Sequence, residues 1–414
     1  MTPEVKKRIE QLRHGNVPEG YMQTRSGIVP LEWTDACLGD VYTERKEPGN
    51  EDLPLLMVSI HSGVSDGEVD EDDLPKKVKR IEDKSQYKRA AKGDLVFNMM
   101  RAWQGAIGTV RTGGMVSPAY IVAEPNDMVD PLFMDYYMKT NRMVHTIHRQ
   151  SYGVTDFRLR LYWDSFSPIP CVLPPVREQK KIAEILTTQD KVIKLKEKLL
   201  AEKRRQKKYL MQQLLTGKKR LPGFDGEWLF VRANTIFKNV TDKKHDGTLE
   251  VLSATQDRGI IPRSQVDIDI KYAEESLTGY KKVVKGNFVI SLRSFQGGIE
   301  YSEYTGIVSP AYTVLSAIYP IEDNYYKQFF KSPDYISKLN VAVYGIRDGK
   351  QISFEDFGRI KIPYPPQEEQ KAIATVLSTA DYEIGLLQQD LEQEKQKKKA
   401  LMQLLLTGIV RINT

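Results

Sequence analysis

The sequence predicts an α+β protein built from two similar halves, each containing one mixed α/β domain and one long helix. Three observations support this prediction. A long stretch of regularly spaced apolar and charged residues occurs twice, short landmarks repeat between the copies, and β-type runs precede a helix in each half. Self-similarity at a period of about 190 residues indicates two equivalent halves rather than a solenoid of short units.

The repeated stretch runs from Pro174 to Gly217 and again from Pro365 to Gly408, at a constant offset of 191 residues (365 minus 174). Two prolines open each copy, and the first helical turn tolerates proline because its N–H groups are unpaired there. The glutamate that follows suits the positive end of a helix dipole. The closing glycine can take the left-handed conformation that ends a helix. Each copy therefore predicts one long helix.

Apolar residues in these helices recur at heptad spacing and predict a narrow seam. The seam comprises Ile182, Leu186, Ile193, Leu200 and Leu210 in the first helix and Ile373, Leu377, Ile384, Leu391 and Leu401 in the second. A stripe this narrow needs a partner, and the obvious partner of each helix is the other one. The alternative is two independent amphipathic helices, each packed on its own domain.

Composition favours a soluble protein of two or three domains. The chain has 414 residues, two cysteines and a net charge of +6, with no apolar run near the length that spans a bilayer. The polar N-terminus does not resemble a signal peptide. Two cysteines without a CxxC motif argue against disulfides and a structural zinc. We therefore expect a cytoplasmic protein without a membrane segment.

The charge is unevenly distributed between the two helices. Residues 177–220 contain 15 Lys or Arg against 5 Asp or Glu, whereas residues 368–411 contain 6 against 7. A basic helix can lie close to nucleic acid or to an acidic partner. A charge run can equally be a solvated helix face, and the count alone favours that interpretation.

The two domains outside the long helices share landmarks and a common order of predicted elements. Segments 53–60, 93–99, 117–123, 286–292 and 309–317 predict strands, while 131–147 and 324–339 predict one helix each. The pentapeptide VSPAY stands at 116–120 and again at 308–312. A short helix is expected from Pro3 to His14. A shared framework with divergent loops suggests two domains that do the same task on different ligands.

Catalytic signatures are missing from the sequence. There is no GxxxxGK[ST] loop, no GxGxxG after a strand, no HExxH and no GxSxG. His145 and His148 are three residues apart but lack a Cys or carboxylate partner, so core or surface histidines are expected and no metal site is predicted. An enzyme acting alone, such as a nuclease or methyltransferase, is therefore disfavoured.

The polar residues that remain suit recognition of nucleic acid. Arginine and glutamine read guanine and adenine edges with paired hydrogen bonds, and nearby glycines allow close backbone approach. The candidates are Arg101, Trp103, Gln104, Thr155, Arg158 and Arg160 in the first half and Arg258, Arg293, Phe295, Gln296, Arg347, Lys350 and Gln351 in the second. The alternative for each is an ordinary turn with a surface side chain. A scaffold whose domains bind protein also remains open.

With this repeat laid out, the chain resembles the specificity subunits of type I restriction–modification systems. The resemblance covers the whole chain and rests on IPCVLPPVREQKKIA at 169–183, IKIPYPPQEEQKAIA at 360–374, the two LLTG helix ends and the repeated VSPAY. It implies two target-recognition domains, 1–173 and 218–363, and two antiparallel spacer helices, 174–217 and 364–414. Each domain would read one half of a split site in double-stranded DNA.

The resemblance also implies a non-catalytic chain with catalytic partners. Two methylation subunits and two restriction subunits would join it. The methyl donor, ATP and Mg²⁺ would be used by those partners, so no cofactor is expected here. Antiparallel helices also follow from topology. A compact second domain joins the end of the first helix to the start of the second, so those two ends lie close together.

Overall fold

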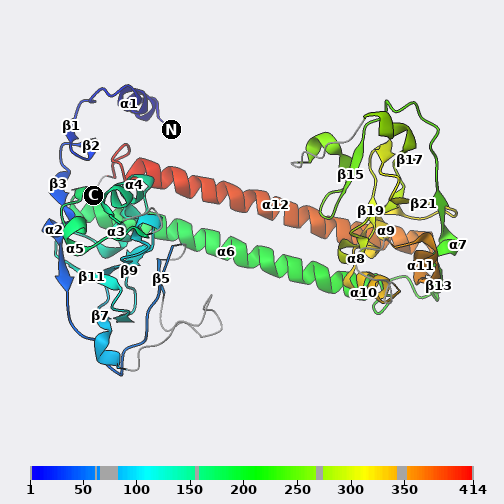
Figure 1. Cartoon of the computed structure of the whole chain (residues 1–414), viewed down its shortest axis with the longest axis horizontal. Helices are drawn as coiled ribbons and strands as arrows, with labels where there is room; N and C mark the ends of the chain where they lie inside the picture. Colours follow the sequence, from blue (N-terminus) through cyan, green and yellow to red (C-terminus); the bar gives the residue numbers. More distant parts are fainter. Residues whose placement is uncertain are drawn as a thin grey trace. The chain divides into compact units, whose positions relative to one another are not determined.

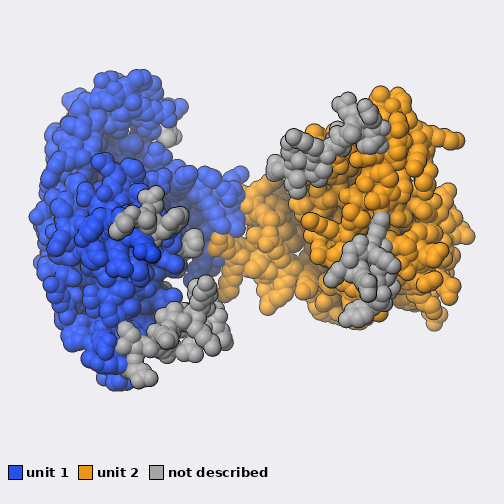
Figure 2. Space-filling view, viewed as in Figure 1, with its two compact units in different colours: residues 1–195, 391–414 blue, residues 196–390 orange. Residues whose placement is uncertain are grey.

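The computed structural model describes residues 2–60, 63–65, 83–153, 158–266, 274–342 and 352–412. The chain forms two compact units (Figure 2). Unit 1 contains Met1–Leu195 and Leu391–Thr414, and unit 2 contains Lys196–Asp390. The two long helices each contribute to both units. Within the described ranges, no helix is long and apolar enough to cross a membrane.

A four-stranded antiparallel sheet forms the centre of unit 1. Its strand order is β4 (Tyr42–Arg45), β11 (Tyr120–Pro125), β8 (Leu95–Asn98) and β9 (Ile107–Thr109). Antiparallel pairs surround it: β7 (Lys88–Ala90) with β10 (Gly114–Val116), β5 (Val58–Ser59) with β6 (Gly63–Val64), β3 (Thr34–Cys37) with β12 (Pro170–Leu173), and β1 (Tyr21–Thr24) with β2 (Gly27–Pro30).

Unit 2 repeats this arrangement. Its sheet has the order β14 (Phe237–Val240), β21 (Thr313–Ala317), β18 (Phe288–Ile290) and β19 (Glu300–Tyr301). The surrounding pairs are β17 (Lys281–Val283) with β20 (Gly306–Val308), β15 (Leu252–Thr255) with β16 (Gly259–Pro262), and β13 (Leu229–Arg232) with β22 (Lys361–Tyr364). The described linker 218–228 forms no counterpart of the β1–β2 hairpin. The mixed α and β class predicted from the sequence is confirmed.

In each unit the segment predicted as one helix forms two helices. Segment 131–147 divides into α3 (Pro131–Tyr137) and α4 (Asn141–Gln150), and segment 324–339 divides into α9 (Asp323–Phe329) and α10 (Pro333–Ala342). The single-helix predictions were wrong because a cap interrupts each segment. The Thr140 hydroxyl accepts the N–H of Met143, and the Ser332 hydroxyl accepts the N–H of Tyr335. Side-chain caps of this kind start a new helix.

Four of the predicted strands and the short N-terminal helix are confirmed, and one predicted strand is largely wrong. Strands β8, β11, β18 and β21 lie where the sequence placed them, and helix α1 spans Pro3–Arg13. Segment 53–60 is mostly not a strand. The N–H of Leu56 donates to the carbonyl of Met115 and the N–H of Met115 donates to the carbonyl of Pro54, but only β5 forms a ladder. Short helices complete the fold: α2 (Leu38–Val41), η2 (Lys84–Gln86), η3 (Ala102–Gln104), α5 (Trp163–Phe166), α7 (Ala233–Ile236), η5 (Arg263–Gln265), η6 (Glu274–Gly279), α8 (Ser294–Gly297) and α11 (Phe354–Arg359).

The two long helices are α6 (Val176–Leu214) and α12 (Gln367–Leu405), each of 39 residues (Figure 1). At 1.5 Å per residue each is roughly 58 Å long. The prolines precede the first turn rather than lying in it, and the carbonyls of Pro175 and Pro366 accept the first intrahelical bonds. Gly217 and Gly408 close the helices with φ of 71° and 70°, as a left-handed cap requires.

Segments of the two helices run antiparallel within each unit. In unit 1, Gln189 Nε2 donates to Glu394 Oε2 (2.6 Å), and Lys398 pairs with Asp190 (2.6 Å). In unit 2, Lys196, Lys203 and Lys207 of α6 pair with Asp390, Glu383 and Asp381 of α12. Partner numbers fall along α12 as they rise along α6, which is the mark of antiparallel neighbours.

The apolar seam residues of the two long helices are all buried or half-buried. In unit 1, Ile182 and Leu186 share a core with the β4–β9 sheet, and Leu401 packs against that core. In unit 2, Ile373 and Leu377 are in the corresponding core, and Leu210 packs against it. Leu200, Ile384 and Leu391 are buried, and Ile193 is half-buried.

Candidate nucleic-acid interface

The repeated Glu-Gln pair at the start of each long helix anchors the rest of its unit. Glu178 is buried in unit 1 and accepts bonds from Arg411 Nε (2.8 Å) and Nη2 (2.9 Å). The buried Gln179 amide accepts the N–H of Asp130 (2.7 Å) and donates to the carbonyl of Met128 (2.9 Å). Asp130 is the N-cap of α3. The motif therefore fixes α3 and the tail after α12 on the base of α6.

Unit 2 repeats these anchors with its own residues. Glu369 accepts Arg220 Nη2 (2.6 Å) and the indole N–H of Trp228 (2.8 Å). Gln370 accepts the N–H of Glu322, which caps α9. The sequence analysis missed Arg220 and Arg411, although a signal was present: each stands three residues after the glycine that closes a long helix. The motif is structural: in each unit it bonds the start of one long helix to a helix N-cap and to the segment after the other long helix.

In unit 1 the first candidate segment follows the central strand β8. Arg101 and Gln104 are exposed on η3, and Gly105 closes the turn with φ of 99°. Trp103 is turned back onto the protein. Its indole N–H donates to the carbonyl of Met100 (3.0 Å), and its ring lies 5.5 Å from that of His148. The polar Arg101 and Gln104 side chains are the ones that this turn presents to solvent.

The second candidate segment lies beside the first. The N–H of Leu161 donates to the carbonyl of Met99 (2.9 Å), which brings the strand-like stretch with Arg158 and Arg160 next to the end of β8. Both arginines are exposed. Thr155 lies outside the described residues. The segment with Arg158 and Arg160 therefore adjoins the stretch that leads from β8 to Arg101 and Gln104.

In unit 2 the corresponding segment follows β18. Arg293 caps α8, and Arg293, Phe295 and Gln296 are exposed there. Phe295 leaves 39% of its surface in solvent, and its neighbour Leu292 leaves 53%. Apolar side chains next to arginine and glutamine suit stacking on a base as well as contact with its edge. Arg347, Lys350 and Gln351 lie outside the described residues.

The turn between β15 and β16 approaches α8. A Cβ atom at Gly297 would lie 2.9 Å from Gln256 Cγ, so the two segments are in close contact. Arg258, on this turn, donates from Nη2 to the carbonyl of Gln265 (3.1 Å) and lies 3.9 Å from Asp257. In unit 1 the corresponding turn includes residues 61 and 62, which are outside the described part of the chain.

Part of the positive charge of α6 is used within the protein. Lys196, Lys203 and Lys207 face carboxylates of α12, so they contribute to helix pairing. Lys194, Lys198 and other basic residues of α6 remain exposed. One side of α6 therefore pairs with α12, which neither interpretation of the charge run included, and the exposed lysines form a solvated helix face whose proximity to nucleic acid stays a prediction.

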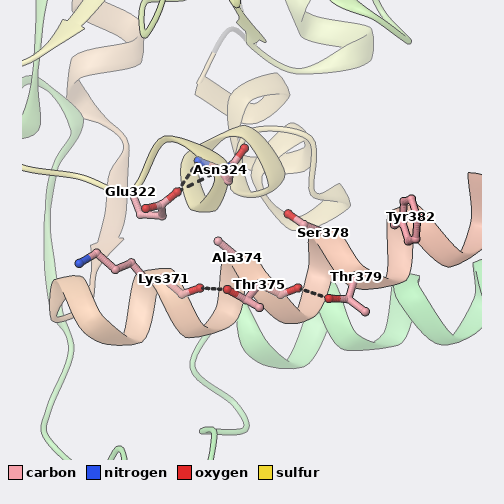
Figure 3. Close-up of a pocket in the computed structure, with 8 residues that line it drawn as sticks. All are labelled: Glu322, Asn324, Lys371, Ala374, Thr375, Ser378, Thr379 and Tyr382. Atoms are coloured by element: carbon pink, nitrogen blue, oxygen red, sulfur yellow. Dashed lines mark hydrogen bonds between the residues drawn. The ribbon is translucent and has the colours of Figure 1, made fainter.

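The hollow shown in Figure 3 lies on α12 and the start of α9, within unit 2. It has a volume of about 570 Å³ and is lined by Glu322, Asn324, Lys371, Ala374, Thr375, Ser378, Thr379 and Tyr382. The hydroxyls of Thr375 and Thr379 donate to backbone carbonyls of their own helix. None of these residues was a sequence candidate, and the two threonine hydroxyls are already engaged. In the described ranges no His, Cys, Asp and Glu side chains gather as a metal-binding group.

Both units present an arginine and a glutamine on the turn that follows a central strand, and unit 2 adds the exposed Phe295. Residues 229–396 match the family model described as the type I restriction modification DNA specificity domain. The chain is 24% identical to the MjaX type I restriction enzyme specificity subunit of Methanocaldococcus jannaschii, over 96% of this chain and 98% of that protein. It is 25% identical to the MjaVIII specificity subunit of the same organism, over 95% and 96%.

Solved structures agree on the fold. The HsdS subunit of Thermoanaerobacter tengcongensis matches with a TM-score of 0.52 at 18% identity, covering 92% of this chain and 98% of that one. A chain from the work on complex assembly and conformational transition of the type I R-M system gives 0.56 at 18%, covering 92% and 99%. The S subunit of M. genitalium gives 0.51 at 14%, covering 92% and 97%.

These comparisons confirm the resemblance to type I restriction–modification specificity subunits that the sequence showed.

Proposed function

We propose that each unit reads one half of a split site in double-stranded DNA. The observation that carries this proposal is the repetition of an exposed arginine–glutamine segment after the central strand of each sheet, at Arg101 and Gln104 in unit 1 and at Arg293 and Gln296 in unit 2. The loops differ in sequence between the units while their framework is the same. Different loops on one framework would read two different half-sequences.

The paired helices would set the distance between the half-sites. In this proposal residues 1–173 and 218–363 are the target-recognition domains, and 174–217 and 364–414 are the spacers. Antiparallel contacts within each unit support a rigid pair of helices. Domains fixed on such a pair would meet the duplex at set intervals, about 34–36 Å for one turn.

The complex would supply the chemistry. Two methylation subunits would dock on the specificity subunit, and two restriction subunits would join them. The methyl donor, ATP and Mg²⁺ would be bound by those partners, in the cytoplasm. The pseudo-repeat supports two copies of each partner, since like units offer like surfaces.

The test is to co-express the chain with its methylation subunit and map modified adenines across the host DNA. We expect a bipartite motif with a fixed gap. Exchanging residues 218–363 for those of another family member should replace one half-sequence and leave the other unchanged. A continuous motif would contradict reading by two units.

The alternative is a helical scaffold whose globular domains bind protein. Salt dependence separates the two, because contacts to about six phosphates reduce affinity roughly a thousandfold or more between 50 and 200 mM salt. Binding of the assembled complex to DNA fragments would show this steep loss. A weak dependence on salt, with no preference for the mapped motif, would favour the scaffold.

A further inference from the structure

One lysine in unit 2 ties the two recognition segments together. Lys331 follows α9, and its ammonium donates to the carbonyls of Gln256 (3.2 Å) and Gly297 (2.9 Å). Gln256 is on the β15–β16 turn, and Gly297 is the last residue of α8. The same ammonium pairs with the carboxylate of Glu300 on β19, whose side chain is only 2% exposed. Three segments therefore meet on one cation.

Unit 1 has a lysine at the corresponding position. Lys139 stands 192 residues before Lys331, the same offset that separates the two VSPAY landmarks (308 minus 116). Its ammonium lies 3.2 Å from both carboxylate oxygens of Asp135. A Cβ atom at Gly63, the first residue of β6, would lie 3.0 Å from this ammonium. In both units the lysine therefore lies beside the equivalent hairpin, β5–β6 in unit 1 and β15–β16 in unit 2.

The carboxylate that faces the lysine comes from different positions in the two units. In unit 1 it is Asp135 of α3, which also accepts Arg111 Nη2 (3.0 Å). At the corresponding places unit 2 has Lys327 and Glu303, which form the same ion pair with its charges reversed (2.7 Å). That reversal removes the acid beside the lysine.

Unit 2 replaces the lost acid from the neighbouring strand. Glu300 stands where unit 1 has Gly108, and a Cβ at Gly108 would lie 3.2 Å from Asp135 Oδ1. The carboxylates of Asp135 and Glu300 therefore occupy neighbouring positions beside the equivalent lysines, although Asp135 belongs to α3 and Glu300 belongs to β19. Burial raises the pKa of Glu300, and Lys331 opposes that rise. The lysine and its place beside the hairpin are retained although the carboxylate that faces it comes from a different element.

We propose that Lys331 and Lys139 are positioning residues for sequence recognition, each holding the hairpin beside it (β15–β16 or β5–β6) in the geometry that reads one half-site. This inference rests on the proposed function. The ammonium does not need to touch DNA. It fixes the backbone that carries Arg293 and Gln296, and the turn that carries Arg258, relative to each other. A displacement of such loops would weaken base discrimination before it weakened phosphate contacts.

The test uses the full chain in complex with its methylation subunit. Lys331→Met alone would leave the buried Glu300 without its cation and could lower stability, so it is combined with Glu300→Gln. The matched control is Lys327→Met, which removes a lysine one turn earlier whose partner Glu303 is exposed. Methylation is compared at the mapped site and at its single-base variants in each half.

In the K331M/E300Q variant we expect discrimination in the unit 2 half-site to fall roughly tenfold, the loss of about one base contact. The other half-site should be unchanged, K327M should match the wild type, and Lys139→Met should affect the opposite half. Unaltered discrimination in K331M/E300Q, or equal losses in both halves, would overturn the proposal.

A second measurement separates this inference from the proposed function. Amide hydrogen exchange on the same complexes should show faster exchange at residues 255–258 and 294–298 in K331M/E300Q and unchanged exchange in α12. If the wild-type map contains no split motif, the proposed function fails. The exchange result then decides whether Lys331 holds the two segments together, and unchanged exchange would refute that role.

Discussion

Removing the cation that faces Glu369 should destabilise unit 2 selectively. The Glu369 side chain is fully buried, and Arg220 and Trp228 are its hydrogen-bond donors. Arg220→Met leaves the carboxylate with the Trp228 indole alone. Breaking a buried pair by removing one partner costs about 3–5 kcal/mol. We take about 3 kcal/mol, since the Arg220 side chain is 23% exposed and the site borders solvent.

For a folded unit of this size, 1 kcal/mol shifts Tm by about 2–4 °C, so R220M should lower the melting of unit 2 by about 6–12 °C. Adding Glu369→Gln should restore at least half of that loss, because the amide oxygen still accepts the Trp228 N–H while the buried charge is gone. Differential scanning calorimetry of the full chain measures both. Arg205→Met is the control, since Arg205 is 79% exposed on α6, the helix that precedes Arg220.

The reasoning would be refuted if R220M melted within about 2 °C of the wild type, a shift below about 1 kcal/mol. It would also be refuted if the R220M/E369Q double variant melted no higher than R220M alone. Either result would mean that Glu369 is solvated or repartnered when Arg220 is lost.

Three further outcomes are expected. Inserting seven residues after Leu200 and seven at the facing position of α12 should lengthen the gap in the methylated motif by about 3 base pairs, since 7 residues rise about 10.5 Å, and both half-sequences should stay the same on the methylation map. Gly385→Ala should stabilise the folded chain by about 1 kcal/mol, because no atom lies within 4 Å of a Cβ added there. Gly408→Ala should destabilise it by about 1–2 kcal/mol, because Gly408 has a positive φ and an added Cβ would lie 2.5 Å from Pro30 Cδ. Urea unfolding of the two variants checks the opposite signs. Arg293→Ala should relax one half-site and Arg101→Ala the other, each by about 1–3 kcal/mol in relative methylation of single-base variants, and a change in the same half from both variants would contradict the assignment.

The parts of the fold that local chemistry determines were predictable from the sequence. The long helices end at Gly217 and Gly408 because a left-handed residue is needed there. The central strands were recognisable from their apolar runs. The breaks at Thr140 and Ser332 were missed because the apolar pattern continues through them, and the capping hydroxyls act on top of it.

The site was only partly predictable, for a different reason. The exposed Arg–Gln turns follow a strand and repeat, so local pattern found them. The hydrogen bonds that hold these turns and helices in place join residues far apart in sequence. Lys331 and Gln256 are 75 residues apart, and Arg411 and Glu178 are 233 residues apart. Such partners leave no local periodicity. For the arginines the internal repeat is the signal that could have found them, because Arg411–Glu178 recurs as Arg220–Glu369 at the offset of the long helices. Whether Trp103 contacts DNA stays a prediction, and its indole already bonds to Met100.

The discontinuous make-up of unit 1 has a consequence for how the chain folds as it is synthesised. The core of unit 1 contains Leu405 and Leu406 beside residues such as Phe133. Unit 2 is one continuous segment of the chain, and in the sequence it separates the two segments that form unit 1. At about 5–20 residues per second, the ribosome needs roughly 10–40 s to make residues 196–390. During that interval the first half has emerged with an open apolar surface, so a chain truncated before residue 405 would leave unit 1 unfinished while unit 2 could close.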